Sequence, residues 1–309
     1  PLQSVRGEMG RIIAGQQALV DRLLLALISD GHVLLEGVPG LAKTLAVKTL
    51  AKTLSGTFSR LQFTPDLLPA DVIGTRIYNA PTGEFSTRIG PVSANIVLAD
   101  EINRASPKTQ SALLEAMEEG KVTVDGVSYD IPDPFTVIAT QNPSGYVGTY
   151  PLPEAQLDRF ALKLKIGYPT AEEEVAILAA RKGENPIDSV RPVINADELR
   201  RIRAEVTEVK MDEELYRYIV TLACATRKHS AIALGASPRA SVALMHLCRA
   251  YAYIKGRNYV IPDDVATLFR PAIAHRLMLR QEAKLKGLTA EAVLGEILRA
   301  TPVPFKGKN

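Results

Sequence analysis

The segment of residues 37–44 has the residue types of a loop that binds phosphate. Glycine lets the backbone wrap closely, so that its N–H groups can point inward at phosphate oxygens. The N-terminus of the helix that follows adds its dipole to this attraction. The spacing matches the P-loop pattern, except that Ala42 stands where the pattern has its second glycine. The segment consists of Gly37, Val38, Pro39, Gly40, Leu41, Ala42, Lys43 and Thr44.

Two side chains at the end of this loop have roles in the chemistry of ATP. We expect Lys43 to reach the β- and γ-phosphates and Thr44 to place its hydroxyl on Mg²⁺. The alternative is a turn of glycine and proline before an ordinary helix. An apolar strand pattern precedes the loop and a helical pattern follows it, and this context favours the phosphate site.

Two consecutive carboxylates end an apolar run of the sequence, residues 95–99. Such a run is typical of a buried central strand, and α/β sheets bind ligands at the carboxyl ends of their strands. We expect Asp100 to hold Mg²⁺ through water and Glu101 to polarise the attacking water as general base. The alternative, that both acids only cap the helix after Ala105, is disfavoured once the phosphate loop is considered with them.

An amide and two arginines are further candidates. Asn142 follows the apolar run 135–139, where it would lie beside the γ-phosphate and orient the water; by spacing alone, a turn residue before Pro143 is an equal alternative. Arg159 precedes the last apolar run, and Arg239 opens a long helical pattern. An arginine near a transferring phosphoryl group contributes about 10³–10⁵ in rate. A surface or salt-bridged arginine is the commoner case, and the sequence alone does not place either side chain on phosphate.

The elements that must position these residues are short apolar runs alternating with helical patterns. The expected helices of this part are 16–29, 43–54 and 107–119. This alternation predicts an α/β domain with a mainly parallel sheet. The expected strands are 32–35, 58–63, 95–99, 135–139 and 162–166.

Two segments exceed a minimal α/β unit and are expected to be insertions or exposed loops. The first, residues 67–92, is rich in turn residues. The second, residues 121–131, has alternating apolar residues on both sides of Asp125-Gly126. Asp-Gly in this setting predicts a hairpin, because a type I′ turn needs positive φ at both central residues.

The character of the chain changes after Pro169. No strand pattern of comparable strength follows, so we expect an all-α domain. The predicted organisation is an α/β nucleotide-binding core at 1–168 and a helical domain at 169–309. The expected helices are 171–181, 196–206, 212–229, 238–255, 262–274 and 289–300.

Length and composition place limits on the function. The 309 residues suffice for about two domains. Hydrophobic residues make up 46% and charged residues 23%, which is ordinary globular composition, and a net charge of +3 is too weak to argue for nucleic acid. Cys224 and Cys248 lie in apolar helical patterns, which predicts buried thiols in a reducing, cytoplasmic compartment. No signal peptide is visible, and no apolar run approaches the ~20 residues that cross a bilayer.

Stretches along nearly the whole chain resemble, in order, the MoxR family of AAA+ ATPases. A lone P-loop would identify only the superfamily, whereas this series is highly specific. The resemblance implies a P-loop AAA+ core, α/β, with a parallel five-stranded sheet of order 5-1-4-3-2 and a C-terminal helical lid. The matching stretches are 37–44, 63–69, 98–105, 108–117, 139–143, 148–160, 235–239 and 259–265.

The resemblance also assigns the two insertions and the adenine side of the site. Residues 67–92 resemble the helix-2 insert, and residues 121–131 resemble the hairpin before sensor 1. The segment around Ile13 and Gly15 resembles the adenine contact. The chain departs from many relatives at 144–147, where they carry acidic residues after the Asn-Pro pair.

Several site residues receive roles from the resemblance. Ala42 is normal in this family. Asn142 becomes the sensor-1 residue, and Arg239 becomes the sensor-2 arginine, which reaches phosphate from the lid of its own subunit. Arg159 becomes the candidate arginine finger for the neighbouring subunit's ATP, with Arg104 as an alternative at the interface.

The expected function is therefore that of a Mg²⁺-dependent ATPase that binds ATP and ADP and works in a ring, with six subunits the family expectation. Relatives mature other proteins or insert cofactors, often with von Willebrand factor A-type partners, so such proteins are the expected clients. One alternative is a nucleic-acid motor, because helicase relatives carry the same insertions and Arg76 and Arg88 lie in the first. The other is a scaffold that binds ATP without turnover, against which the paired acids argue.

Overall fold

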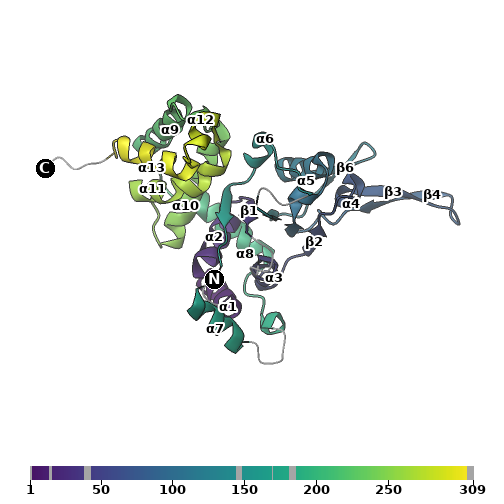
Figure 1. Cartoon of the computed structure of the whole chain (residues 1–309). Helices are drawn as coiled ribbons and strands as arrows, with labels where there is room; N and C mark the ends of the chain where they lie inside the picture. Colours follow the sequence, from purple (N-terminus) through teal and green to yellow (C-terminus); the bar gives the residue numbers. More distant parts are fainter. Residues whose placement is uncertain are drawn as a thin grey trace. The chain divides into compact units, whose positions relative to one another are not determined.

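The computed structural model shows an α/β part followed by helices (Figure 1). It describes residues 2–13, 16–37, 43–143, 148–168, 170–180 and 186–304. For residues 173, 176, 177, 179, 180 and 186 it describes the backbone alone.

Five strands of the described chain form one sheet with the order β2-β5-β8-β1-β9. In chain order these are strands 2, 3, 4, 1 and 5 of the sheet, so the predicted order 5-1-4-3-2 is confirmed. The pairings β2 with β5, β5 with β8 and β8 with β1 are parallel. The strands are β1 (Val33–Glu36), β2 (Phe58–Gln62), β5 (Ile96–Asp100), β8 (Thr136–Gln141) and β9 (Leu162–Lys165).

The two central strands, β5 and β8, are buried along their whole length. Parallel strands covered on both faces read as continuous apolar runs rather than as alternating ones, which is why the sequence revealed them. Because the paired strands are parallel, their carboxyl ends meet at one edge of the sheet. That edge carries Asp100 at the end of β5 and Asn142 directly after β8.

Helices accompany these strands at the predicted places. The helix α3 begins at Lys43, directly after the phosphate loop. The helix α1 and the short helix α4 were not predicted from the periodicity. The elements are α1 (Leu2–Ile12), α2 (Gln17–Ile28), α3 (Lys43–Thr53), α4 (Pro69–Ile73), η1 (Ile102–Arg104), α7 (Ala171–Ala180), η2 (Pro186–Ser189) and α8 (Ala196–Thr207).

The helix α5 (Pro107–Glu119) has the predicted bounds and clear end signals. The hydroxyl of Ser106 caps its start by accepting from the N–H of Thr109 at 3.4 Å, and proline occupies its first turn. Gly120, with φ of 63°, ends it in the left-handed conformation that glycine adopts most easily.

Both predicted insertions contain antiparallel hairpins. The first holds β3 (Gly74–Asn79) and β4 (Glu84–Ile89), and the second holds β6 (Lys121–Val124) and β7 (Val127–Asp130). In the second, Asp125 and Gly126 have φ of 48° and 80°, which confirms the predicted turn with two positive φ angles.

The C-terminal part contains the predicted helices, and the structure adds short helical elements at 154–157, 274–276 and 281–285 and one small sheet. A two-stranded antiparallel sheet, β10 (Ile232–Leu234) with β11 (Met278–Leu279), was too short for the sequence to reveal. No helix of the described chain is long and apolar enough to span a membrane. The helices are α6 (Glu154–Leu157), α9 (Glu213–Lys228), α10 (Pro238–Ile254), α11 (Pro262–Ile273), η3 (Ala274–Arg276), α12 (Gln281–Leu285) and α13 (Ala290–Ala300).

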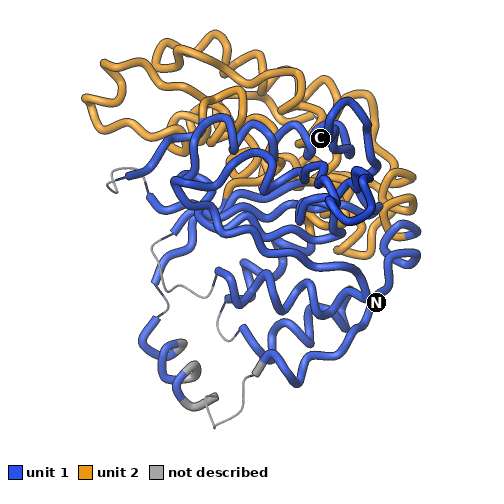
Figure 2. The backbone as a smooth tube through the Cα atoms, turned by 90° about the vertical axis from the view of Figure 1, so that its right-hand side faces the viewer, with its two compact units in different colours: residues 1–24, 32–152, 164–201 blue, residues 25–31, 153–163, 202–309 orange. Residues whose placement is uncertain are grey.

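Contacts divide the chain into two compact units (Figure 2). Unit 1 comprises residues 1–24, 32–152 and 164–201, and unit 2 comprises residues 25–31, 153–163 and 202–309. Residues 153–163, which include Arg159, thus group with the C-terminal helices. The domain boundary between 168 and 169 stays a prediction.

Candidate functional site

Five of the predicted residues meet at the carboxyl edge of the sheet in unit 1. We call Lys43, Thr44, Asp100, Glu101 and Asn142 the carboxyl-edge cluster. The hydroxyl of Thr44 donates to the Asp100 carboxylate at 3.3 Å, and the amide of Asn142 donates to Glu101 at 3.2 Å. The topology therefore brings together residues that lie up to 99 positions apart in the chain.

Asp100 is almost fully buried and accepts hydrogen bonds on both carboxylate oxygens. Its Oδ1 accepts from the Thr140 hydroxyl at 2.7 Å. Its Oδ2 accepts from Thr44 and also from Arg60, whose Nη2 lies at 2.7 Å. Buried carboxylates require such partners, and Arg60, on β2, is one that the sequence did not indicate.

Glu101 turns away from the line of its strand. Its φ of 56° is uncommon for a residue other than glycine, and its N–H donates to the Thr140 hydroxyl at 2.8 Å. The carboxylate accepts from Gln62 at 3.2 Å and from Arg104 at 3.1 Å, in addition to Asn142. Thr140 thus fixes both acids, and Glu101 is held by three donors among the described residues.

The side-chain amide of Asn142 is buried, and its nitrogen and oxygen differ in their hydrogen bonding. Its nitrogen donates to Glu101, while its Oδ1 has no hydrogen-bond partner among the described residues. Its backbone is fixed by the side chain of Asn103, which donates to the Asn142 carbonyl at 3.2 Å. A buried acceptor of this kind needs a donor, and a water molecule between Asn142 and Glu101 would supply one.

Lys43 is buried at the start of α3. Its Nζ donates to the carbonyl of Gly37 at 2.5 Å and lies 3.5 Å from the carbonyl of Gln141. Burial lowers the pKa of the Lys43 ammonium from its ordinary value, although the carboxylates of Asp100, Glu101 and Glu36 act in the opposite direction. Desolvation disfavours a cation, so this ammonium would gain from the negative charge of a phosphate.

The residues present fit a magnesium ion. Mg²⁺ prefers hard oxygen ligands and is commonly held by one or two protein side chains together with substrate phosphates and water. The hydroxyl of Thr44 and the carboxylate of Asp100 lie next to each other and provide this set. Within the described part of the chain, no group of three or more His, Cys, Asp or Glu residues forms an all-protein metal site.

Part of the predicted site lies outside the described residues. This holds for Val38, Pro39, Gly40, Leu41 and Ala42 of the phosphate loop, for Gly15, and for the departure at 144–147. Of the remaining members, Gly37 donates its N–H to the Gln141 carbonyl at 3.4 Å, and Ile13 is buried.

The two predicted arginines both belong to unit 2. Asp158, the residue before Arg159, accepts from the hydroxyl of Ser237 at 2.8 Å and pairs with Arg276 at 3.3 Å. Arg239 follows Ser237 in the first turn of α10. Burial lowers the pKa of Arg276 to about 10; Asp158 opposes this shift and Arg239 adds to it. The contact of Arg159 or Arg239 with ATP stays a prediction.

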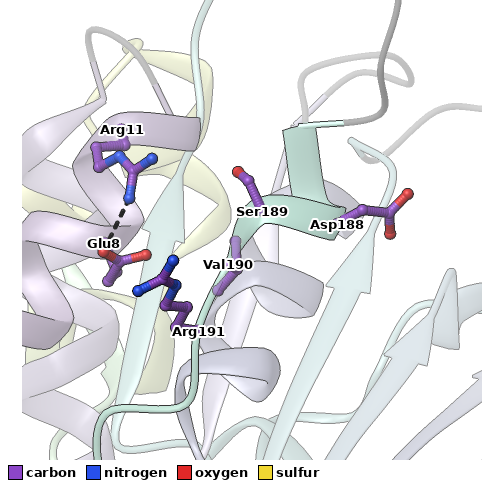
Figure 3. A pocket seen from close by; sticks show the side chains of 6 residues that line it. All are labelled: Glu8, Arg11, Asp188, Ser189, Val190 and Arg191. Atoms are coloured by element: carbon purple, nitrogen blue, oxygen red, sulfur yellow. Dashed lines mark hydrogen bonds and ion pairs between the residues drawn. The ribbon is translucent and has the colours of Figure 1, made fainter.

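A separate pocket of about 510 Å³ in unit 1 contains no member of the carboxyl-edge cluster (Figure 3). Within it, Arg11 and Glu8 neutralise each other at 3.0 Å. The lining also holds Asp188 and Arg191, so acidic and basic side chains are present in equal number. It is lined by Glu8, Arg11, Asp188, Ser189, Val190 and Arg191.

Comparisons with known proteins agree with the site. Residues 32–162 match the family model "ATPase family associated with various cellular activities (AAA)", and residues 224–297 match the model "AAA lid domain". The Chaperone MoxR1 of Mycobacterium tuberculosis is 47% identical over 306 residues, which cover 96% of this chain and 81% of that protein. This chain belongs to the MoxR family of AAA+ ATPases.

Two further relatives of this MoxR-family chain have similar extent. YeaC of Bacillus subtilis, described as uncharacterized, is 52% identical over 298 residues, covering 96% of this chain and 93% of that protein. A solved structure from Cytophaga hutchinsonii is 42% identical with a TM-score of 0.90, covering 97% of this chain and 94% of that one. The predicted family and fold class are confirmed.

Sequence reasoning missed several partners of the MoxR-family site. Arg60 and Gln62 stand two positions apart on β2, and this alternation was the signal that both could reach the same side of the sheet. Asn103 was seen only as part of a family motif. None of them has a type or spacing that indicates chemistry by itself.

Proposed function

We propose that this MoxR-family ATPase hydrolyses ATP to ADP and phosphate with Mg²⁺ at the carboxyl-edge cluster. The observation that carries the proposal is the convergence of two pairs, Thr44 with Asp100 and Asn142 with Glu101, at one edge of the sheet. The first pair suits the metal and the second suits a water nucleophile. In this proposal, residues 38–42 would complete the phosphate-binding loop.

Each residue of the cluster would have a separate role in ATP hydrolysis. Lys43 would bind the β- and γ-phosphates, while Thr44 and Asp100 would hold the metal. Held by these two residues, Mg²⁺ would supply positive charge that offsets the negative charge developing on the phosphates during transfer. Glu101 would accept a proton from the attacking water as general base. Asn142 would orient that water through its Oδ1, which has no partner in the described part of the chain, while its nitrogen keeps Glu101 in place.

The remaining nucleotide contacts come from the family pattern. Ile13 and Gly15 would border adenine. Arg239 would act as sensor 2 from the lid of the same subunit, and Arg159 would reach the ATP of the neighbouring subunit in a ring, for which six copies is the expectation. An arginine at that place stabilises the charge of the transferring phosphoryl group.

A chaperone-like role on protein clients is the output we propose for this ATPase, in the cytoplasm. One relative is named as a chaperone. The β3–β4 hairpin supports a client contact, because Tyr78 and Phe85 are 56% and 59% exposed with ring centroids 5.1 Å apart. Clustered exposed aromatic residues mark interaction surfaces. Proteins with von Willebrand factor A domains, in maturation or cofactor insertion, are the candidate clients.

Glu101→Gln tests the hydrolysis mechanism. The amide keeps the shape of the side chain but cannot accept the proton, so we expect phosphate release to fall by about 10²–10⁴ while ATP binding is retained. The matched control is Glu115→Gln, which changes an exposed carboxylate on α5 and should leave turnover unchanged. Turnover of Glu101→Gln at the wild-type rate would refute the role of Glu101 as base.

A further inference from the structure

Arg60 forms a contact with Asp100 that the proposed mechanism does not use. Its Nη2 and Nε lie 2.7 Å and 3.2 Å from Oδ2 of Asp100. The guanidinium therefore donates two N–H groups to one carboxylate oxygen. In the parallel pairing of β2 with β5, Gln62 stands opposite Asp100. Arg60 therefore reaches forward along the strand to meet the carboxylate.

The oxygen that Arg60 binds is also the one on the metal side. Thr44, the other proposed metal ligand, donates its hydroxyl to this same Oδ2 at 3.3 Å. The Asp100 side chain is only 10% exposed, and a carboxylate so buried needs a counter-charge. Arg60 provides such a charge, and a bound magnesium ion would provide a second one.

Two cations near one carboxylate, one of them held through water, repel each other and share a single negative charge. The side chain of Arg60 is 42% exposed, so it can leave Asp100 for solvent without losing a buried position. Its Nη2 also donates to the Oε1 of Gln62 at 2.8 Å, so Asp100 is not its sole partner. The geometry thus allows exchange, which a fully buried ion pair would resist.

We propose that Arg60 is a built-in counter-cation that competes with Mg²⁺ for Asp100, and so sets the Mg²⁺ concentration at which the nucleotide site becomes active. This inference rests on the proposed function of Asp100 as a metal-site residue. Arg60 acts here through Asp100 and is a positioning residue, which neutralises the carboxylate when no metal is bound and releases it when one is.

Removing the competitor should tighten metal binding. In Arg60→Gln, the polar side chain remains but the positive charge is gone. We expect the affinity for Mn²⁺, used as a spectroscopic probe for Mg²⁺, to rise about fivefold, the order expected for a partly exposed ion pair. Free Mn²⁺ is followed by electron paramagnetic resonance as the metal is added to the full chain saturated with ADP.

Two variants serve as controls. Arg60→Lys keeps the charge and should stay near the wild-type affinity for Mn²⁺. Arg88→Gln removes an equal charge from β4 and should have no effect on this affinity. Equal or weaker Mn²⁺ binding by Arg60→Gln, with ADP still bound, would overturn competition and show instead that Arg60 helps to shape the metal site.

Thermal denaturation separates the counter-cation role from a purely structural one. Without Arg60, Asp100 keeps its two threonine donors but loses its ion-pair partner, so in the presence of EDTA the melting temperature of Arg60→Gln should fall below wild type. Addition of Mn²⁺ and ADP should remove most of that difference. A loss of equal size in both conditions would overturn the proposal. Failure of the proposed function would give a different result. In that case, Lys43→Ala would bind ADP as tightly as the wild-type chain does.

Discussion

Single residues in this protein owe their chemistry to what surrounds them. Glu101 has a left-handed backbone, which costs a residue other than glycine about 1–2 kcal/mol. The cost is tolerated because the Thr140 hydroxyl accepts the Glu101 N–H and donates to Asp100. One hydroxyl thereby fixes the directions of both acids, the one proposed for the metal and the one proposed for the water.

At the same scale, His275 carries a partly buried imidazole in unit 2. Its Nε2 lies 2.8 Å from the carbonyl of Phe160. Burial, with the charge of Arg276, lowers the pKa of His275 to about 3, against the opposing effect of the Phe160 hydrogen bond. Between pH 6.5 and 3 the unfolded chain therefore binds a proton that the folded chain refuses. The resulting stabilisation is complete above pH 6.5 and is lost as the pH falls toward 3.

We predict that this histidine steepens the loss of stability in acid. Its contribution to the free energy of unfolding should change by about 1.4 kcal/mol per pH unit below its unfolded pKa. Urea unfolding of the wild-type chain and of His275→Gln at pH 7 and pH 5 measures the difference. The variant should lose less stability between the two pH values, whatever its absolute stability. Parallel pH dependences would contradict the prediction.

At the scale of elements, the start of α10 is joined to the segment before β9. Ser237 caps α10 by accepting from the N–H of Ala240 at 3.1 Å, and it donates to Asp158 at 2.8 Å. Arg276, which is buried, donates to the carbonyl of Phe160 at 2.8 Å. These contacts hold both residues that flank Arg159. The segment of the proposed arginine finger is thus fixed by the helix that carries Arg239.

Ser237→Ala should therefore affect turnover more than an ordinary loss of a helix cap. Both Ser237→Ala and Thr289→Ala, which uncaps α13, should cost about 1 kcal/mol of stability. Only the first also loses the bond to Asp158, so only it should reduce the ATPase rate of the assembled protein. Phosphate release and chemical denaturation measured on both variants make the comparison. Equal ATPase rates in the two variants would refute the connection.

At the scale of the whole molecule, the proposed ring predicts that each subunit supplies Arg159 to the ATP site of its neighbour. Arg159→Ala should slow hydrolysis by about 10³ in the assembly without weakening ATP binding to a single chain. Mixing it with Lys43→Ala should restore part of the rate. The Lys43→Ala subunits cannot bind their own ATP, but they carry the Arg159 that their neighbours lack.

The control for this mixture is the double variant Lys43→Ala with Arg159→Ala, which has no arginine to supply. Phosphate release is measured at ratios of the two proteins, and light scattering verifies that mixed assemblies form. If mixed assemblies recover no more activity with Lys43→Ala than with the double variant, Arg159 does not act between subunits.

The sequence by itself determined the family, the strand order implied by it, and the membership of the carboxyl-edge cluster. These depend on local information: a loop between a strand and a helix, and polar residues directly after apolar runs. In parallel α/β sheets, the carboxyl ends of neighbouring strands meet at one edge. Residues such as Lys43, Asp100 and Asn142 could therefore be placed together from their positions in the strand pattern.

Only the tertiary structure decided which other side chains meet this cluster. Arg60 and Asp100 are forty positions apart, and their contact depends on the register of β2 on β5. Likewise, residues 153–163 lie between stretches of unit 1 in the chain but group with unit 2, through Asp158 and Phe160. Ion pairs and buried hydrogen bonds of this kind are set by side chains meeting across elements, which no local periodicity encodes.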